Sequence, residues 1–230
     1  MRDYVVDIND EISEELIDRV VNELRGIYDY DKYLLSTFVD PSKEIISEVT
    51  ISINSGGGDV SGFSRIKTEI DKLKELGIHI KTHVTHLAAS CAFLILLLGD
   101  ERSGSEFCEL MNHVSTTVNY GKVTSNARMA EFHLELEDRF TKFIVDRTNI
   151  DRKWLDENSE IDQWFNYDDA IELGIFTTEE ELNNEIYLSE TVSQLTASGY
   201  NVIDDIHKEY EDVVEEVEVK KPKRIKKKVE

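Results

Sequence analysis

The chain has 230 residues, 40% of them hydrophobic and 32% charged, which suffices for one substantial domain or at most two small ones. Its formal net charge of −22 argues against nucleic acid as a partner of the folded body, because the phosphate backbone attracts cations. Two cysteines cannot build a disulfide framework, and the longest apolar run, residues 87–98, is too short to span a bilayer, so we expect a cytoplasmic protein.

Apolar patterns predict strands and helices in turn along the chain. Short β-branched or alternating stretches predict strands, and apolar residues spaced three to four apart predict helices. The expected strands cover residues 4–8, 49–53, 78–84 and 107–111, and the expected helices cover residues 13–27, 60–76, 88–98, 127–147 and 168–173. Residues 28–47 separate the first helix from the second strand. This order predicts an α/β sheet built from right-handed crossovers.

A run of three glycines, Gly56-Gly57-Gly58, follows the second predicted strand and precedes a predicted helix. Glycines allow positive φ and close approach of the backbone to a ligand. Amides in such a loop can point together at a developing negative charge. The run matches neither the P-loop nor the GxGxxG pattern, and we expect no cofactor. A simple tight turn is the alternative interpretation.

Ser90 lies among small and apolar residues, just after a predicted strand and at the start of a predicted buried helix. Small neighbours on both sides leave room for a substrate chain. The serine could cap the helix by accepting a bond from an unpaired amide. Alternatively, it could be a nucleophile whose oxyanion is stabilised by the amides that follow it.

His113 ends a predicted strand, and Asp162 precedes a pair of aromatic residues. Taken singly, the histidine could simply be accommodated in the packing and the aspartate could be a helix cap. Together with Ser90 they supply a nucleophile, a base and a group that orients the base, which are the three roles that acyl transfer needs.

Three further histidines, His79, His83 and His86, lie on a predicted strand and the turn after it. No cysteine or glutamate completes a zinc-ligand set with them. We therefore expect no metal site.

The end of the chain is highly charged. Residues 209–218 are acidic, whereas residues 220–230 contain seven cations and one anion. We predict one domain over residues 1–204, followed by a disordered acidic-then-basic tail over residues 205–230. The alternative is that the tail is an electrostatic docking or localisation tag.

Two stretches, INSGGGDVSGF and HLAASCAFLILLLG, resemble the proteolytic subunit of the Clp protease, ClpP. In that family a Ser-Pro-Gly-Gly loop and an Ala-Ala-Ser-Met-Gly-Ala motif occupy the corresponding places. The run Tyr-Asp-Asp-Ala-Ile-Glu-Leu-Gly, ending at Gly174, is similar to the family's Ser-Ala-x-Glu-Ala-x-x-Tyr-Gly segment. The chain order of serine, histidine and aspartate also fits, and the resemblance covers roughly residues 4–178.

The resemblance implies an α/β, ClpP/crotonase-like fold with a β-β-α superhelical core and a protruding handle helix within about residues 115–147. It implies that Ser90 is the nucleophile, His113 the general base and Asp162 its orienter. The amides of Gly58 and Cys91 would form the oxyanion hole.

Substrate, by the same resemblance, would lie against Gly57 and a strand over residues 116–124 that includes Thr116, Thr117 and Val118. The resemblance further implies heptameric rings, possibly paired as a tetradecamer, that degrade unfolded polypeptides. An AAA+ unfoldase of the Clp type would be the partner, and ATP would bind to that partner.

Several positions depart from the family pattern. Gly56 stands where the family has proline, Ala92 stands where it has glycine, and Val114-Ser115 replaces Gln-Pro after the histidine. The chain begins almost at its first strand, so we expect an N-terminally trimmed member without the axial gate segment. Trimmed relatives of this kind occur in bacteriophages, which would place the protein in the host-cell cytoplasm.

Three functions follow as hypotheses. The leading one is a serine endopeptidase that cleaves peptide bonds inside a ring-shaped compartment through an acyl-enzyme. The second is a catalytically latent ring subunit or scaffold. The third is an acyl-CoA enzyme of the crotonase type, which shares the fold and a two-amide oxyanion hole but needs no Ser-His-Asp set.

Overall fold

A computed structural model describes residues 2–37, 45–115 and 122–178 of the chain. By internal contacts the chain divides into two units, Met1–Phe176 and Thr177–Glu230, and the fold below is that of the first. The predicted tail, the predicted domain end at residue 204 and the segment from Thr116 to Val118 lie outside the described residues.

One mixed sheet carries the strands of this unit. Its order is β1-β2-β3-β5-β6, and β4 pairs separately with β3. All of the strand pairs are parallel except β5 with β6, which is antiparallel. The strands are β1 (Arg2–Asn9), β2 (Ile46–Ser55), β3 (His79–Ala89), β4 (Glu101–Gly104), β5 (Glu109–Asn112) and β6 (Gln163–Phe165).

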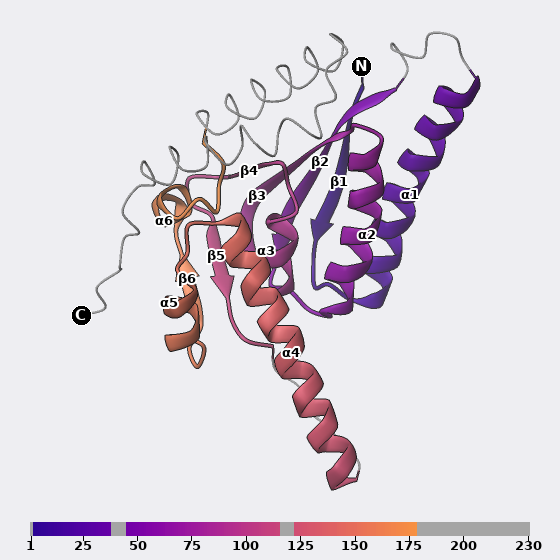
Figure 1. Ribbon diagram of the computed structural model, residues 1–230. Coiled ribbons are helices and arrows are strands. Elements are labelled where there is room, and N and C mark those ends of the chain that lie inside the picture. The colour runs from indigo at the N-terminus through magenta and orange to yellow at the C-terminus, as the bar shows by residue number, and fades with distance from the viewer. Residues whose placement is uncertain (1, 38–44, 116–121, 179–230) are drawn as a thin grey trace, which may run out of the picture. The chain divides into compact units, whose positions relative to one another are not determined.

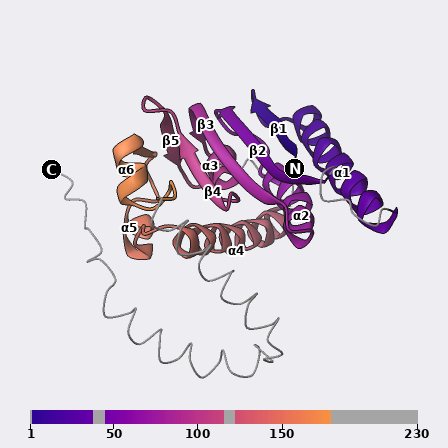
Figure 2. The ribbon, with the colours of Figure 1, turned by 90° about the horizontal axis from the view of Figure 1, so that it is seen from above.

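The described part of the unit has six helices. Figure 2 shows α1 beside β1 at one edge of the sheet, with α5 and α6 beyond β5 at the other. Helices α1 and α2 pack against each other, and α3 packs against β3. The helices are α1 (Glu14–Thr37), α2 (Ser61–Glu75), α3 (Cys91–Leu96), α4 (Val123–Arg147), α5 (Arg152–Glu157) and α6 (Tyr167–Glu172).

The hydrophobic periods of the sequence account for the core. In β2, the alternating residues Val49, Ile51 and Ile53 are fully buried, as expected for a strand. The apolar stripe of α2 is buried at its helical spacing, and every residue of the short helix α3 is buried. The predicted strands and helices are therefore present, and the mixed α/β architecture is confirmed.

Several boundaries differ from the sequence prediction. The helix predicted over residues 88–98 begins only at Cys91, because Ala88 and Ala89 extend β3 and pair with Leu110 and Met111 of β5. A short apolar run does not by itself distinguish a buried strand from a buried helix. Strands β4 and β6 and helix α5 have no counterpart among the predicted elements.

Helix α1 also runs ten residues past its predicted end at Ile27. Within this extension Asp31 is buried, and both of its carboxylate oxygens accept the amide of Ile46, at 3.2 and 3.0 Å. Burial raises the pKa of the Asp31 carboxyl, and the Ile46 amide only partly opposes it. The contact joins the last turns of α1 to the start of β2.

The long helix α4 supplies the predicted handle. Its carboxyl-terminal half packs on the core, where Phe140 and Phe143 meet Phe63 edge to face with ring centroids 5.6 and 5.1 Å apart. Its amino-terminal half extends away from the sheet (Figure 1), and Met129 and Phe132 are exposed there. No helix within the described residues is both long enough and apolar enough to cross a membrane.

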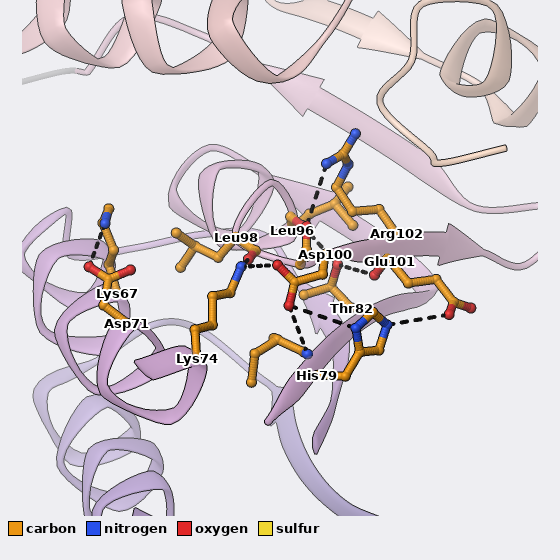
Figure 3. Close-up of polar contacts among 12 residues, drawn as sticks. Lys67, Asp71, Lys74, His79, Thr82, Leu96, Leu98, Asp100, Glu101 and Arg102 are labelled. Carbon is orange, nitrogen blue, oxygen red and sulfur yellow. Dashed lines mark hydrogen bonds and ion pairs between the residues drawn. The ribbon is translucent and has the colours of Figure 1, made fainter. Parts of the chain in front are cut away.

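Polar contacts secure the amino end of β3 (Figure 3). Lys74 of α2 donates to the Leu98 carbonyl at 2.8 Å and also to the Asp100 carboxylate. Asp100 in turn accepts the amide of Ile80 at 3.0 Å, and His79 approaches the same carboxylate at 4.0 Å. The contacts join α2, β3 and the turn after α3 at the end of β3 opposite to Ser90.

Candidate active site

Ser90 occupies the sharp junction between β3 and α3. Its backbone has φ 56° and ψ −122°, and it is the only non-glycine residue with positive φ in the described part of the chain. Its amide donates to the Met111 carbonyl of β5 at 2.8 Å, which holds the junction against the neighbouring strand. A backbone outlier of this kind costs about 1–3 kcal/mol and persists where the surroundings enforce it, often at functional sites.

The Ser90 side chain does not cap the helix that follows it. Instead, its Oγ lies 2.8 Å from Nε2 of His113, within hydrogen-bond distance. The geometry therefore favours the interpretation of Ser90 as a nucleophile beside its base over the interpretation as a helix cap.

Asp162 lies on the other side of the His113 ring. Its Oδ1 is 3.7 Å from Nδ1 of His113, which is an ion-pair distance rather than a hydrogen bond. The side chain of His113 is 28% exposed and that of Asp162 is 59% exposed. The fold thus brings all three predicted residues into the order Ser, His, Asp, with the outer contact looser than the inner one.

The glycine loop packs directly against Ser90. Gly57 has φ 94°, and a Cβ added there would lie 2.6 Å from the Ala89 carbonyl oxygen and 2.7 Å from the Ser90 Cβ. No side chain fits at either contact. The close approach that Gly57 permits is therefore to the segment that carries Ser90, since only a glycine lets the two segments come this close.

The predicted oxyanion donors belong to the same contact. Ile12 pairs with Gly58 in an isolated parallel bridge. The Ile12 amide donates to the Gly57 carbonyl and the Asp59 amide donates to the Ile12 carbonyl, both at 2.8 Å, so the Gly58 amide is not used by this bridge. The amide nitrogen of Cys91 lies 3.2 Å from the position that a Gly57 Cβ would take. The Gly58 and Cys91 amides therefore belong to two segments in direct contact beside Ser90.

The thiol of Cys91 is not a rival nucleophile. The residue is buried, and its Sγ donates to the Asp59 carbonyl at 3.4 Å. Burial raises the pKa of the Cys91 thiol to about 12, so the thiolate is scarce at neutral pH.

A pocket opens beside the serine and histidine. Its apolar walls come from α3, α4 and α5, namely from Leu94, Phe140, Ile144 and Leu155. Polar walls come from Asn112, Ser115, Glu137 and Gln163, among others. Glu137 of α4 accepts the Ser115 amide at 3.1 Å and so fixes the chain just beyond His113.

The sequence prediction named none of these eight wall residues as site residues, and two of them, Asn112 and Gln163, contact each other. Their side-chain amides bond to each other at 2.7 Å across β5 and β6. Each adjoins a predicted site residue in the chain, but the contact depends on strand register, which no local pattern reveals. Among the described residues, no group of three or more His, Cys, Asp or Glu side chains could hold a metal ion.

One comparison with known proteins bears on this site. The family model described as Clp protease matches residues 1–178, which is 178 of the 230 residues. The match includes β1 through α6 and every described residue of the site.

Proposed function

The chain belongs to the Clp protease family, and from this premise we propose that it is a serine endopeptidase whose nucleophile is Ser90. The family relationship gives the chain the ClpP-type α/β fold with its mostly parallel sheet. The single observation that carries the proposal is the 2.8 Å distance between Ser90 Oγ and His113 Nε2.

Acylation follows from that contact. Ser90 Oγ attacks the carbonyl carbon of the scissile peptide bond while His113 Nε2 takes the hydroxyl proton. Asp162, across the ring from Ser90, orients the imidazole and stabilises its charged form. The 3.7 Å separation of His113 and Asp162 shortens on substrate binding, because catalytic contacts commonly tighten only in the complex.

The tetrahedral intermediate carries its negative charge on the former carbonyl oxygen. The amides of Gly58 and Cys91 are the proposed donors to that oxygen. When the intermediate collapses, His113 gives its proton to the leaving amine, and an ester to Ser90 remains. Water, deprotonated by His113, then attacks the ester and restores the free serine.

The pocket beside Ser90 supports a preference for an apolar side chain on the acyl side of the cleaved bond. Leu94, Ile144 and Leu155 offer apolar contact, and burial of an apolar side chain there contributes about 25 cal/mol per Å². We propose Gly57 and the segment with Thr116, Thr117 and Val118 as the backbone surface that holds an extended, unfolded polypeptide.

Assembly into rings is proposed on the family relationship and on the exposed handle. Met129, Phe132 and Leu134 of α4 are apolar and exposed, which is typical of a surface that another subunit covers. The proposed assembly is a heptameric ring, single or paired, that receives unfolded chains from an AAA+ unfoldase of the Clp type.

A fluorophosphonate probe tests the proposal, because it reacts covalently with an activated serine. Intact mass after labelling would be compared for wild type, Ser90→Ala and the surface control Ser64→Ala on α2, with native mass of the assembly measured alongside. Labelling of wild type and Ser64→Ala but not of Ser90→Ala, in a particle of seven or fourteen subunits, is the expected result. Labelling of Ser90→Ala would refute the assignment of the nucleophile.

A second candidate is a catalytically latent ring, which the exposed Asp162 and its loose contact with His113 favour. An assembled particle that the probe does not label would support this candidate. The acyl-CoA enzyme is less well supported, because it gives no role to the contact between Ser90 and His113.

A further inference from the structure

Gln163, which is buried, and Asn112, which is half-buried, form an amide pair at the edge of the candidate site. We propose that this pair is a positioning device that holds Asp162 in register with His113. The proposal rests on the proposed peptidase function and adds two residues to its machinery. Neither residue touches the reacting atoms, so each acts through its chain neighbour.

Both halves of the Gln163 amide are engaged. Its Oε1 accepts the Asn112 Nδ2 at 2.7 Å, and its Nε2 donates to the Asn158 carbonyl at 3.1 Å. The residue is only 4% exposed. A buried primary amide with both ends bonded is held in one orientation, because loss of either partner leaves a polar atom unsatisfied.

The amide pair lies at the end of the short pairing between strands β5 and β6. Strands β5 and β6 pair over only three positions, and Asn112 opposite Gln163 is the last of them. His113 follows Asn112 in the chain, and Asp162 precedes Gln163, so the two site residues lie one step beyond this last pair. The amide pair is thus the cross-strand link nearest to His113 and Asp162.

Gln163 also closes the loop that carries Asp162. Its Nε2 and the Ile161 amide both donate to the Asn158 carbonyl, the latter at 3.2 Å. Asn158 is in turn fixed to α5 by its side chain, which donates to the Trp154 carbonyl at 2.8 Å. No hydrogen bond within the described residues holds the Asp162 carboxylate itself, so its place depends on this loop.

Strand β5 connects the pair to the nucleophile as well. The Met111 carbonyl, one residue before Asn112, accepts the Ser90 amide at 2.8 Å. Ser90, His113 and Asp162 are therefore each held within one residue of a contact that β5 makes. A displacement of about 1 Å in such a set costs on the order of 100-fold in rate.

The test uses side chains of similar size that cannot form the bond, Asn112→Leu and Gln163→Met. Labelling rate, kcat and KM for a fluorogenic peptide would be measured for each, and for each combined with Asp162→Asn. We expect kcat to fall about 10- to 100-fold. We also expect that adding Asn112→Leu or Gln163→Met to the Asp162→Asn variant lowers kcat almost no further. If the amide pair acts only by positioning the Asp162 carboxylate, it has no effect once that carboxylate is removed.

Two readouts separate positioning from a general loss of structure. The pH–rate profiles of Asn112→Leu and Gln163→Met should resemble that of Asp162→Asn. The control is Trp164→Leu, because Trp164 lies in the neighbouring β5–β6 pair, opposite Met111, and the residue is 52% exposed. This variant should keep the wild-type rate and pH profile. If Gln163→Met does not assemble, Asn112→Leu at the half-buried position gives the same comparison.

The outcomes distinguish this proposal from the proposed function. An active wild type with undiminished Asn112→Leu and Gln163→Met variants overturns the positioning role alone. Equal fold losses with and without Asp162→Asn also overturn it, because the effect would then not pass through Asp162. A wild type that is neither labelled nor active overturns the peptidase and the positioning role together.

Discussion

The Oγ of Ser90 lies 2.8 Å from Nε2 of His113, although the two residues leave different strands of the sheet and are separated by 23 positions in the chain. Their parallel strands β3 and β5 pair directly, with Ala89 opposite Met111, so the carboxyl ends of both strands lie at the same edge of the sheet. The contact is therefore a product of strand register. In the proposed mechanism, this contact is the path by which the hydroxyl proton passes to the imidazole.

A first prediction concerns the shared role of these two residues. Ser90→Ala and His113→Ala should each lower kcat about 10⁶-fold, toward the background rate, and the double variant should be no worse than either. Residues that act as one unit lose their whole contribution when either is removed. Peptide turnover by the three variants in assembled particles measures this, and additive losses would show that the two act separately.

Gly57 and its neighbour Gly56 provide a second, sharply contrasting prediction. Gly57→Ala should abolish labelling and lower the thermal midpoint, because the new Cβ would clash with the Ala89 carbonyl and the Ser90 Cβ at a φ of 94°. Such strain costs about 1–3 kcal/mol. Gly56→Ala should be tolerated, since nothing lies within 4 Å of its Cβ. Equal behaviour of the two variants in labelling and calorimetry would contradict the close packing of loop and nucleophile.

Much of this arrangement was predictable from the sequence. The apolar periods predicted the core strands and helices, and motif order singled out Ser90, His113 and Asp162 as a set. The end of β3 was not predictable in this way, because Ala88 and Ala89 are equally compatible with a helix until β5 pairs with them.

The remaining differences have similar causes. Strand β6 has three residues, too few to show an alternation, and it exists because it pairs with β5. The last ten residues of α1 include few buried apolar side chains, so their sequence shows no apolar helical pattern that would predict the helix. The contact between Asn112 and Gln163 needs both strands in register, which local sequence does not specify.

A third prediction uses the buried carboxylate of Glu69 between two cations. Burial alone raises the pKa of Glu69, but hydrogen bonds from Arg25 at 2.8 Å and Lys72 at 2.9 Å outweigh it and hold the pKa below its usual value. A lowered folded-state pKa adds stability above the unfolded value of 4.5, and this stability is lost as the pH falls through the folded value.

Glu69→Gln should therefore destabilise the protein at pH 7 by about 1 kcal/mol, and the deficit should shrink as the pH drops below about 4.5. Urea unfolding at several pH values would measure the difference from wild type. Glu75→Gln, at an exposed position on the same helix, is the matched control and should change little. A deficit that does not depend on pH would exclude the ionised carboxylate as its source.

The fourth prediction has the opposite sign and concerns Asp31, which joins the end of α1 to β2. Burial raises the pKa of this carboxyl above 3.8, despite the bonds from the Ile46 amide. Its protonated form therefore favours folding, and that contribution is lost as the pH rises through the folded-state pKa. Asp31→Asn keeps an oxygen for the Ile46 amide and removes the charge, so it should raise the thermal midpoint at pH 7.

The stability advantage of Asp31→Asn over wild type should vanish toward pH 3, whereas Asp29→Asn at an exposed position of α1 should show no such trend. A lower midpoint for Asp31→Asn at pH 7 would mean that the charged bond to Ile46 outweighs the cost of burial.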